Sequence, residues 1–396
     1  MRVLIVLTYY RPHVSGLTIY AERLAQQLTE RGHHVTVLCS RHDRSLPSRE
    51  LVDGVRIVRV PVLARISKGV VMPMPLWALW HVWRHDAVSV HVPQFDGGAV
   101  ALIGRLARRR TVVTYHCDLR LPEGLINRLA DAATYLMNLV AAGFAHEVVA
   151  YTEDYADHSS LLKRFRGKVR VCPPPVVMDE PDPAAVEQLR AAWGASEGPV
   201  IGMAARLATE KGVEFLVQAM PIVLERFPDA RVVFAGAHAD VVGEAHYRAK
   251  LAPSIQRLGG RWRFVGELGP DEMAAFFGAL DVLVVSSVNS TESFGLVQVE
   301  AMLCGTPVVA TDLPGVRQPV AMTGMGVVVP PADAAALAAG LVEVVAEPDR
   351  YVVPRSRIQA RFDVSATMAC YEDMLATRPD GGHGADATAE VRHGTE

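Results

Sequence analysis

The chain has 396 residues, of which 50% are hydrophobic and 21% are charged, and its formal net charge is −3. A single hydrophobic core stops growing near about 250 to 300 residues, so this length predicts two domains. The composition is typical of a folded α/β protein and excludes a disordered or fibrous chain.

The charge is divided unevenly along the sequence. Residues 1–180 carry 23 Lys and Arg against 16 Asp and Glu, a net charge of +7, whereas residues 181–396 carry 17 against 27, a net charge of −10. A basic half can face anionic lipid or a phosphorylated substrate. Ordinary variation in surface charge is the alternative, so the asymmetry supports a peripheral membrane contact without deciding it.

Cysteines and apolar stretches bear on the compartment. No Cys-x-x-Cys pair is present, so the sequence predicts neither a disulfide framework nor a zinc site, as is typical of a reducing cytosol. The opening run "MRVLIVLTYY" is too short for a signal segment and predicts a first strand. No apolar stretch reaches the roughly 18 residues of a spanning helix. We therefore expect a cytoplasmic protein, with membrane-peripheral attachment as an addition. The cysteines are Cys39, Cys117, Cys172, Cys304 and Cys370.

The first half of the sequence alternates strands and helices. Residues 2–7 predict a buried strand, residues 17–32 an amphipathic helix and residues 34–40 a second strand, which together form a βαβ unit. Such alternation predicts a parallel sheet covered by helices on both faces. Further strands are expected at 54–61, 87–93, 110–116 and 147–152.

A stretch rich in proline and acidic residues, "VCPPPVVMDEPDP", separates this half from the next and is typical of a linker. After it the α/β pattern restarts and predicts a second doubly wound domain. The last residues lack large apolar side chains apart from one valine, which predicts disorder. The expected divisions are an N-terminal Rossmann-like domain at 1–172, a linker at 173–186, a second Rossmann-like domain at 187–354, a helical segment crossing back to the N-terminal domain at 355–377, and a disordered tail at 378–396.

Two such domains create a cleft between them, and open α/β sheets bind ligands beyond the carboxyl ends of their strands. Neither half carries a Gly-x-Gly-x-x-Gly fingerprint or a Walker phosphate loop, so binding of a dinucleotide or ATP is weakly supported. We expect a site for another ligand in the interdomain cleft.

The stretch "TESFGLVQVEAMLCGTPVVATDLPG" at 291–315 contains two glutamates, Glu292 and Glu300. Within one helix their Cα atoms would lie about 12 Å apart along the axis, too far to serve one small reacting centre. Gly295 instead predicts a helix beginning near Gly295 or Leu296, with Glu292 reaching over its N-terminus and Glu300 on its second turn. The N–H groups of Phe294, Gly295 and Leu296 would then bind an anion. Carboxylates for hydroxyls and amides for phosphate suit a sugar diphosphate.

With "GMAARLATEKG" before this stretch and "CGTPVVATDLPG" within it, the sequence resembles the retaining nucleotide-sugar glycosyltransferases of the GT-B fold, in particular their fourth family. The similarity covers about residues 1–377. It implies an α/β fold of two Rossmann-like domains facing an interdomain cleft. It also implies metal-independent transfer, with no cofactor, of a sugar from a UDP-, GDP- or ADP-sugar to a carbohydrate, lipid-linked or small-molecule acceptor; no nucleic acid is expected as a partner.

The resemblance also implies roles in the second domain. Arg206 and Lys211 would hold the donor diphosphate, where their positive charge favours the departing group. Glu292 would bind the donor sugar near its anomeric centre, and Glu300 would bind the ribose. The backbone of Val265–Gly266 would meet the nucleobase.

In the first domain, the family's glycine-containing loop corresponds to "YYRPHVSGLT". Only Gly16 of the usual glycine pair is present, because Ser15 stands in the other position. His116 matches the family histidine near the transferred sugar. Asp118 and His91 are expected on the acceptor side.

Other interpretations remain open at this point. A glycoside hydrolase could use Glu292 and Glu300 as its acid and nucleophile, although the two cations nearby favour a diphosphate. A GT-B nucleotide-sugar epimerase and an inactive binding protein are further alternatives. Trp77, Trp80 and Trp83 form an aromatic stripe that could belong to the core, to an acceptor groove or to a membrane-surface patch.

Overall fold

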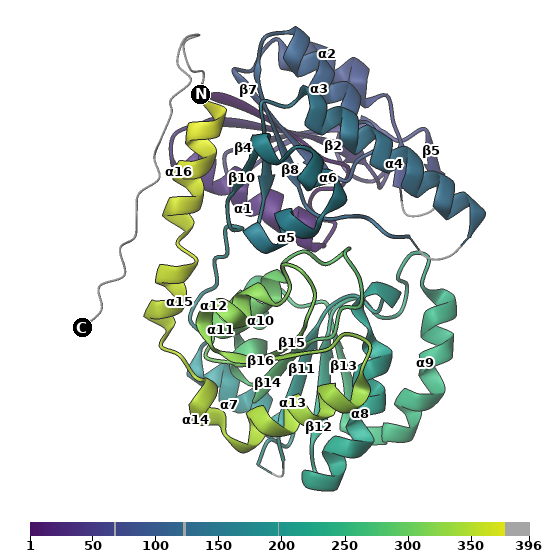
Figure 1. Cartoon of the computed structure of the whole chain (residues 1–396), viewed down its shortest axis with the longest axis vertical. Coiled ribbons are helices and arrows are strands. Elements are labelled where there is room, and N and C mark those ends of the chain that lie inside the picture. Colours follow the sequence, from purple (N-terminus) through teal and green to yellow (C-terminus); the bar gives the residue numbers. More distant parts are fainter. Residues whose placement is uncertain (67–68, 122–123, 197, 377–396) are drawn as a thin grey trace.

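The structure is a computed structural model that describes residues 1–66, 69–121, 124–196 and 198–376. Figure 1 shows two α/β halves, with the N-terminal half at the top. The tail expected at 378–396 lies outside the described residues.

The N-terminal half is built on a sheet whose described strands follow the order β10-β9-β8-β7-β1-β2-β4-β3. Its neighbours pair in parallel, except that β3 runs antiparallel to β4. β5 and β6 form a separate antiparallel pair. The strands are β1 (Arg2–Val6), β2 (His34–Arg41), β3 (Arg49–Val52), β4 (Val55–Pro61), β5 (Ala64–Ile66), β6 (Gly69–Val71), β7 (Ala87–Val92), β8 (Arg110–Tyr115), β9 (Glu147–Ala150) and β10 (Val169–Val171).

Helices cover this first sheet. α1 begins with a capping box, in which the Thr18 N–H donates to Ser15 Oγ at 3.2 Å and the Ser15 N–H donates to Thr18 Oγ1 at 2.7 Å. Ser15 therefore fixes where the helix starts. The helices are α1 (Gly16–Glu30), α2 (Met74–Val82), α3 (Gly97–Leu106), α4 (Leu125–Phe144), α5 (Glu153–His158), α6 (Ser160–Arg164) and the 3₁₀ helix η1 (Arg166–Lys168).

The second half has a parallel sheet in the order β13-β12-β11-β14-β15-β16. Its strands are β11 (Val200–Ala204), β12 (Arg231–Ala235), β13 (Trp262–Gly266), β14 (Val282–Val285), β15 (Val308–Thr311) and β16 (Gly326–Val329). Its helices are α7 (Pro183–Ala192), η2 (Thr209–Lys211), α8 (Val213–Arg226), α9 (Ala245–Leu258), η3 (Gly259–Arg261), α10 (Pro270–Gly278), α11 (Leu296–Leu303), α12 (Gln318–Thr323), α13 (Ala334–Ala346) and α14 (Pro348–Tyr351).

The strand orders explain where ligands can bind. Among the parallel strands of each sheet, the order in which successive strands are added reverses direction at one point. This point lies between β1 and β7 in the first sheet and between β11 and β14 in the second. Helices that follow strands on either side of such a point leave in opposite directions and open a crevice at the carboxyl ends. The predicted α/β class with two Rossmann-like sheets is confirmed.

Alternation along the strands assigns the helices to opposite faces of each sheet. Val3 and Ile5 of β1 belong to a core with residues of α1, whereas Leu4 and Val6 belong to a core with residues of α2 and α3. In β14, Leu283 and Val285 share a core with α10 and α11, while Val282 and Val284 share one with α8 and α13. Both sheets are therefore buried on two faces.

The last two helices, α15 (Arg355–Arg361) and α16 (Val364–Leu375), return the chain to the first half, and Figure 1 shows them along one edge of the molecule. Tyr371 OH lies 2.9 Å from Thr114 Oγ1 of β8, and Arg110 Nε donates to the Met374 carbonyl at 2.8 Å. The final helix thus packs on the N-terminal sheet.

One expectation from the sequence is wrong. Cys172, just after β10, forms a disulfide with Cys370 of α16, and their Cα atoms lie 6.6 Å apart. The prediction of no disulfide considered only spacing along the chain, whereas the two cysteines meet because α16 crosses back over 198 residues. Cys39, Cys117 and Cys304 are free.

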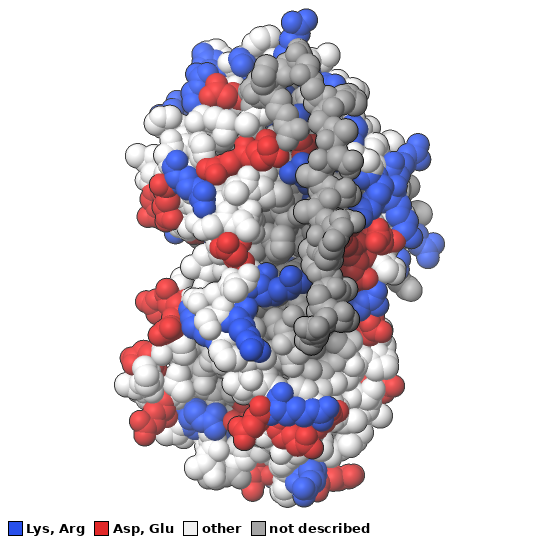
Figure 2. Space-filling model, turned by 60° about the vertical axis from the view of Figure 1, so that its left-hand side comes forward, with Lys and Arg blue, Asp and Glu red and all other residues white. Residues whose placement is uncertain are grey.

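Two further surface features follow from the fold. Within the described residues, the helices are too short or too polar to traverse a bilayer. Figure 2 shows the waist between the two halves and basic side chains along the edges of the upper, N-terminal half.

The disulfide predicts a measurable stabilisation. Because it ties α16 to the start of the linker, Cys370→Ser should lower the free energy of unfolding by about 2 to 4 kcal/mol. Urea denaturation of the oxidised protein measures this difference. Dithiothreitol should destabilise the unmodified chain to the same extent and leave Cys370→Ser unchanged; an equal response of both proteins to the reductant would contradict the crosslink.

Candidate active site

The loop after β14 and the start of α11 form the centre of the candidate site. α11 begins at Leu296, and Gly295 before it has a φ of +75°, a conformation that favours glycine. Glu292 lies over this helix start, where its Oε1 accepts a hydrogen bond from the Gly295 N–H at 3.0 Å. Glu300 lies on the second turn and is buried. The predicted geometry of the two glutamates is confirmed.

One part of the anion-site prediction needs correction. The Gly295 N–H does not point freely into the cleft, because the carboxylate three residues earlier already accepts its hydrogen bond. Phe294 directs its side chain into the core, where its ring lies 6.1 Å from that of Tyr151. Glu292 thus holds the backbone of the residue before α11 with one oxygen and pairs with Lys211 through the other.

The two predicted cations come from the loop after β11. Lys211 ends η2, and its Nζ forms an ion pair with Glu292 Oε2. Arg206 pairs instead with Glu210 at 3.1 Å and is partly exposed. Charge from Arg206 contributes, after burial and the neighbouring His42, to lowering the pKa of His13 to about 4. Since His13 belongs to the first domain, the charge of Arg206 acts across the boundary between the domains.

Glu300 has a partner that the sequence did not suggest. Arg23, in the middle of α1, reaches from the first domain and places Nη2 at 2.7 Å from Glu300 Oε1. Both side chains are largely buried, and Arg23 Nη1 is buried without a hydrogen-bond partner in the structure. The carboxylate expected to bind ribose is therefore held by a cation of the opposite domain.

His116 lies within a buried polar chain that runs from Tyr151 to Ser89. His91 Nδ1 lies 2.9 Å from His116 Nε2, and His91 Nε2 lies 3.2 Å from Ser89 Oγ. Tyr151 OH contacts His116 Nδ1. Neutral imidazoles satisfy this chain if Tyr151 donates to His116, His116 to His91 and His91 to Ser89.

Burial keeps both histidines neutral. Burial lowers the pKa of His91 to about 3. Burial, and the repulsion that two protonated rings in contact would experience, hold the pKa of His116 well below its ordinary value. Each ring nitrogen of His116 contacts a protein group, and its side chain is 6% exposed. In this conformation both ring nitrogens of His116 are engaged within the N-terminal domain.

Asp118 holds the first domain against the loop before α11. Its Oδ1 accepts hydrogen bonds from Tyr115 OH at 2.6 Å and Ser159 Oγ at 2.9 Å. Its carbonyl accepts from Ser290 Oγ at 3.2 Å, and the His116 carbonyl accepts from Ser293 Oγ. Asp118 is thus a connector between domains.

A second contact between the domains involves Asp154 of α5. Its carboxylate accepts from the Gly315 N–H at 2.8 Å and pairs with Arg317 at 2.5 Å. Burial opposes the charge of Asp154, but the bonds from Arg317 and Gly315 hold its pKa below the ordinary value. Gly315 ends the "LPG" stretch that follows the two glutamates in the sequence, and Arg317 comes two residues later.

The remaining predicted residues lie at strand or helix ends. Gly16 is the first residue of α1, and an added Cβ there would meet open space. Val265 and Gly266 end β13, and Gly266 has a φ of +82°. Beside them, the rings of His238 and Phe264 stack with centroids 4.3 Å apart.

Arg23, Tyr151 and His238 were missed from the sequence. Tyr151 and His238 directly follow or closely follow strands β9 and β12, so the rule that sites gather at carboxyl ends of strands could have found them. Arg23 lies within a helix next to apolar positions and carries no such signal.

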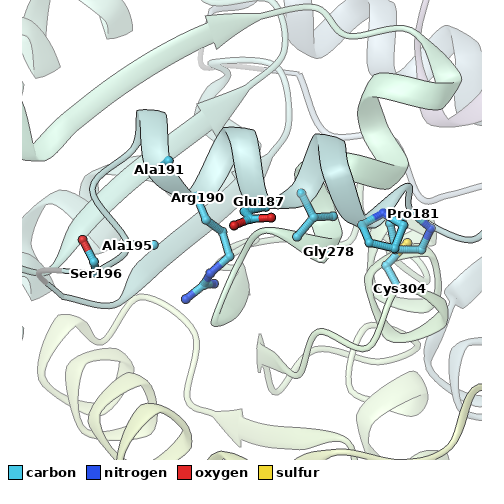
Figure 3. Close-up of a pocket in the computed structure, with 10 residues that line it drawn as sticks. Pro181, Glu187, Arg190, Ala191, Ala195, Ser196, Gly278 and Cys304 are labelled. Atoms are coloured by element: carbon cyan, nitrogen blue, oxygen red, sulfur yellow. The ribbon is translucent and has the colours of Figure 1, made fainter.

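A pocket of about 590 Å³ lies elsewhere, between α7, α10 and the end of α11 (Figure 3). None of the predicted site residues lines it. Its arginine, Arg190, is engaged with Asp281 at 3.2 Å and with the Ala279 carbonyl at 3.0 Å. We assign this pocket to the docking of α7 on its own domain.

Comparison with known proteins agrees with this geometry. Residues 15–175 match the model of the "Glycosyl transferase 4-like domain", and residues 186–360 match "Glycosyl transferases group 1". The 2-deoxystreptamine N-acetyl-D-glucosaminyltransferase of Streptomyces fradiae is 31% identical over 85% of this chain and 84% of its own length. The chain belongs to the family 4-type glycosyltransferases of the GT-B fold.

Other glycosyltransferases are also similar. The D-inositol 3-phosphate glycosyltransferase of Corynebacterium urealyticum is 28% identical over 85% of this chain and 84% of its own length. The crystal structure of Anabaena HepE in complex with UDP and glucose superimposes with a TM-score of 0.77, at 19% identity, over 95% of this chain and 99% of that one. The chain is therefore a GT-B glycosyltransferase that uses nucleotide or related sugar donors.

The buried histidines predict a pH dependence of stability. In the unfolded glycosyltransferase the pKa of His91 is about 6.5, whereas in the folded protein it is about 3. Between these two values the unfolded state therefore binds a proton at His91 that the folded state does not bind. As the pH is lowered below the pKa of the unfolded state, the free energy of unfolding should fall by about 1.4 kcal/mol per pH unit for each such histidine.

His91→Gln should remove one such contribution and flatten the slope between about pH 6 and pH 4. Urea unfolding across this range measures the slope, and comparison at about pH 8, where both side chains are neutral, isolates any packing loss. An unchanged slope would show that His91 does not remain neutral in the folded protein.

Proposed function

We propose that this glycosyltransferase transfers a sugar from a nucleoside-diphosphate sugar to an acceptor hydroxyl with retention of configuration and without a metal. The observation that supports it most is the Lys211–Glu292 ion pair at the start of α11, with Arg206 on the same loop as Lys211. A cation and a carboxylate side by side suit a diphosphate and the sugar it carries.

The proposed reaction needs only groups of the chain and its two substrates. The bond between the anomeric carbon and the diphosphate oxygen breaks, and the electron pair leaves with the nucleoside diphosphate. Lys211 and Arg206 stabilise this negative charge because they act in a partly dry cleft. The acceptor oxygen attacks the same face and forms the new glycosidic bond, while its proton passes to a leaving phosphate oxygen.

We place the ribose at Glu300 and the base near Val265–Gly266. Glu300 Oε1 contacts Arg23, which leaves its second oxygen as the acceptor for ribose hydroxyls. The stacked rings of His238 and Phe264 offer a flat surface beside these residues. The donor proposed here is a UDP-, GDP- or ADP-sugar.

The acceptor side is assigned to the first domain. Tyr9, His13 and His42 follow β1 and β2, and their rings lie within 5.7 Å of one another. Ring faces of this kind pack against the apolar face of a sugar or cyclitol. Relatives are named for 2-deoxystreptamine and D-inositol 3-phosphate, and a carbohydrate, lipid-linked or small-molecule acceptor is proposed here.

Family membership weakens the other interpretations. Membership of a glycosyltransferase family argues against the glycoside hydrolase interpretation. In that interpretation Glu292 and Glu300 would act as acid and nucleophile, but in the structure each is paired with a cation. An epimerase or an inactive binding protein of the same fold would form no glycoside of an acceptor, so detection of a transferred sugar in the assay below separates them from the proposal.

The first test measures the product. With UDP-, GDP- and ADP-sugars supplied in turn, one donor should be consumed in the presence of EDTA, and proton NMR should show the donor's anomeric configuration in the transferred or hydrolysed sugar. Full loss of turnover in EDTA, restored by Mg²⁺, would contradict metal independence. A product of inverted configuration would contradict retention.

A pair of variants tests the site residues. Lys211→Ala should lower kcat by about 100-fold or more, because it removes charge that stabilises the leaving group. Glu300→Gln should instead raise the KM for the donor about tenfold, a loss of about 1.4 kcal/mol in binding, with a smaller change in kcat.

The exposed Glu225→Gln on α8 is the matched control and should change neither constant. Thermal unfolding of each variant checks that the fold persists. Unchanged kinetics in both site variants would remove the donor assignment.

A further inference from the structure

The outward face of α2 is unusually apolar for a surface helix. Leu76, Leu79, Trp80 and Trp83 follow the helical spacing of one face, and each is between 50% and 73% exposed. The opposite face is also apolar, because Met74, Ala78 and Val82 are buried in the N-terminal core. The helix therefore presents a second hydrophobic face to solvent.

Only one of the three tryptophans of the stripe belongs to the core. Trp77 is half-buried and packs against the N-terminal core, whereas Trp80 and Trp83 are exposed. Single exposed apolar residues are ordinary, but a contiguous patch of large ones marks an interaction surface. Figure 1 places α2 at the end of the N-terminal domain farthest from the second domain, so this face is not part of an interdomain acceptor groove.

Arginines surround this face. Arg84 lies over the Trp80 ring at 3.3 Å, and Arg109 Nη2 donates to the Trp83 carbonyl at 3.1 Å, which brings the end of α3 beside α2. In that segment Arg105 and Arg108 are exposed, together with Leu106. We call Leu76, Leu79, Trp80, Trp83, Leu106, Arg84, Arg105 and Arg108 the α2 face.

Acidic residues are absent from the segments that form the α2 face. Residues 54–85 and 97–117 contain no Asp or Glu. Asp86, just after the first segment, is neutralised by Arg2 at 2.6 Å. Burial and the charges of His85, Arg49, Arg84 and Arg56 lower the pKa of His81 on α2 to about 4, as a positive local potential requires.

We propose that the α2 face docks this glycosyltransferase on an anionic lipid bilayer. Indole rings favour the boundary between headgroups and acyl chains, and arginines beside them attract acidic headgroups. A second copy of the chain is a poor occupant, because pairing two α2 faces would bring like charges together. The proposal does not depend on the identity of the donor or acceptor.

Sedimentation with vesicles tests the proposal. The full chain should bind vesicles containing about 30% phosphatidylglycerol at least tenfold more strongly than pure phosphatidylcholine vesicles, and about 0.5 M NaCl should release it. Trp80→Ser combined with Trp83→Ser should abolish binding, and Arg105→Gln combined with Arg108→Gln should weaken it about tenfold.

Val242→Ser, at an exposed apolar position of the second domain, is the control and should bind as the unmodified chain does. Thermal unfolding and donor turnover in solution should be unchanged in all variants. Equal binding to both vesicle types, no binding to either, or retained binding by the double tryptophan variant would each overturn the proposal. So would self-association that the tryptophan substitutions abolish, since it would identify a second copy as the occupant.

Discussion

The candidate active site depends on one contact, in which the loop before α11 lies against the end of β8. Ser293 donates to the carbonyl of His116, and Ser290 donates to that of Asp118. These bonds join the carboxyl ends of two sheets, the regions where parallel α/β folds bind ligands. Because Glu292 belongs to the same loop, its position over the start of α11 is fixed by both domains at once.

Charge compensation follows from that contact. Lys211 neutralises Glu292 within the second domain, and Arg23 neutralises Glu300 from the first. Buried charges without partners are costly, so these pairs let acidic and basic groups coexist in a cleft before a substrate arrives.

Much of this organisation was predictable from the sequence. Strand and helix periodicity predicted the two α/β units, and Gly295 predicted where α11 begins, because these depend on local pattern. The sequence did not predict the antiparallel strand β3, the pairing of Arg23 with Glu300 or the Cys172–Cys370 bond. The ion pair and the disulfide depend on contacts between segments far apart in the chain, whereas β3 pairs with the neighbouring β4 across Asp53–Gly54, a local hairpin signal that was overlooked. The expectation of a free Gly295 amide was wrong because Glu292 accepts its hydrogen bond.

The return of α16 to the first domain limits how the two halves can move. The chain passes between the halves twice, once after Cys172 and once before Cys370, and the disulfide ties these two passages together. Figure 1 shows α15 and α16 along one side of the molecule. The two connections and the disulfide therefore restrain the halves together on that side of the molecule.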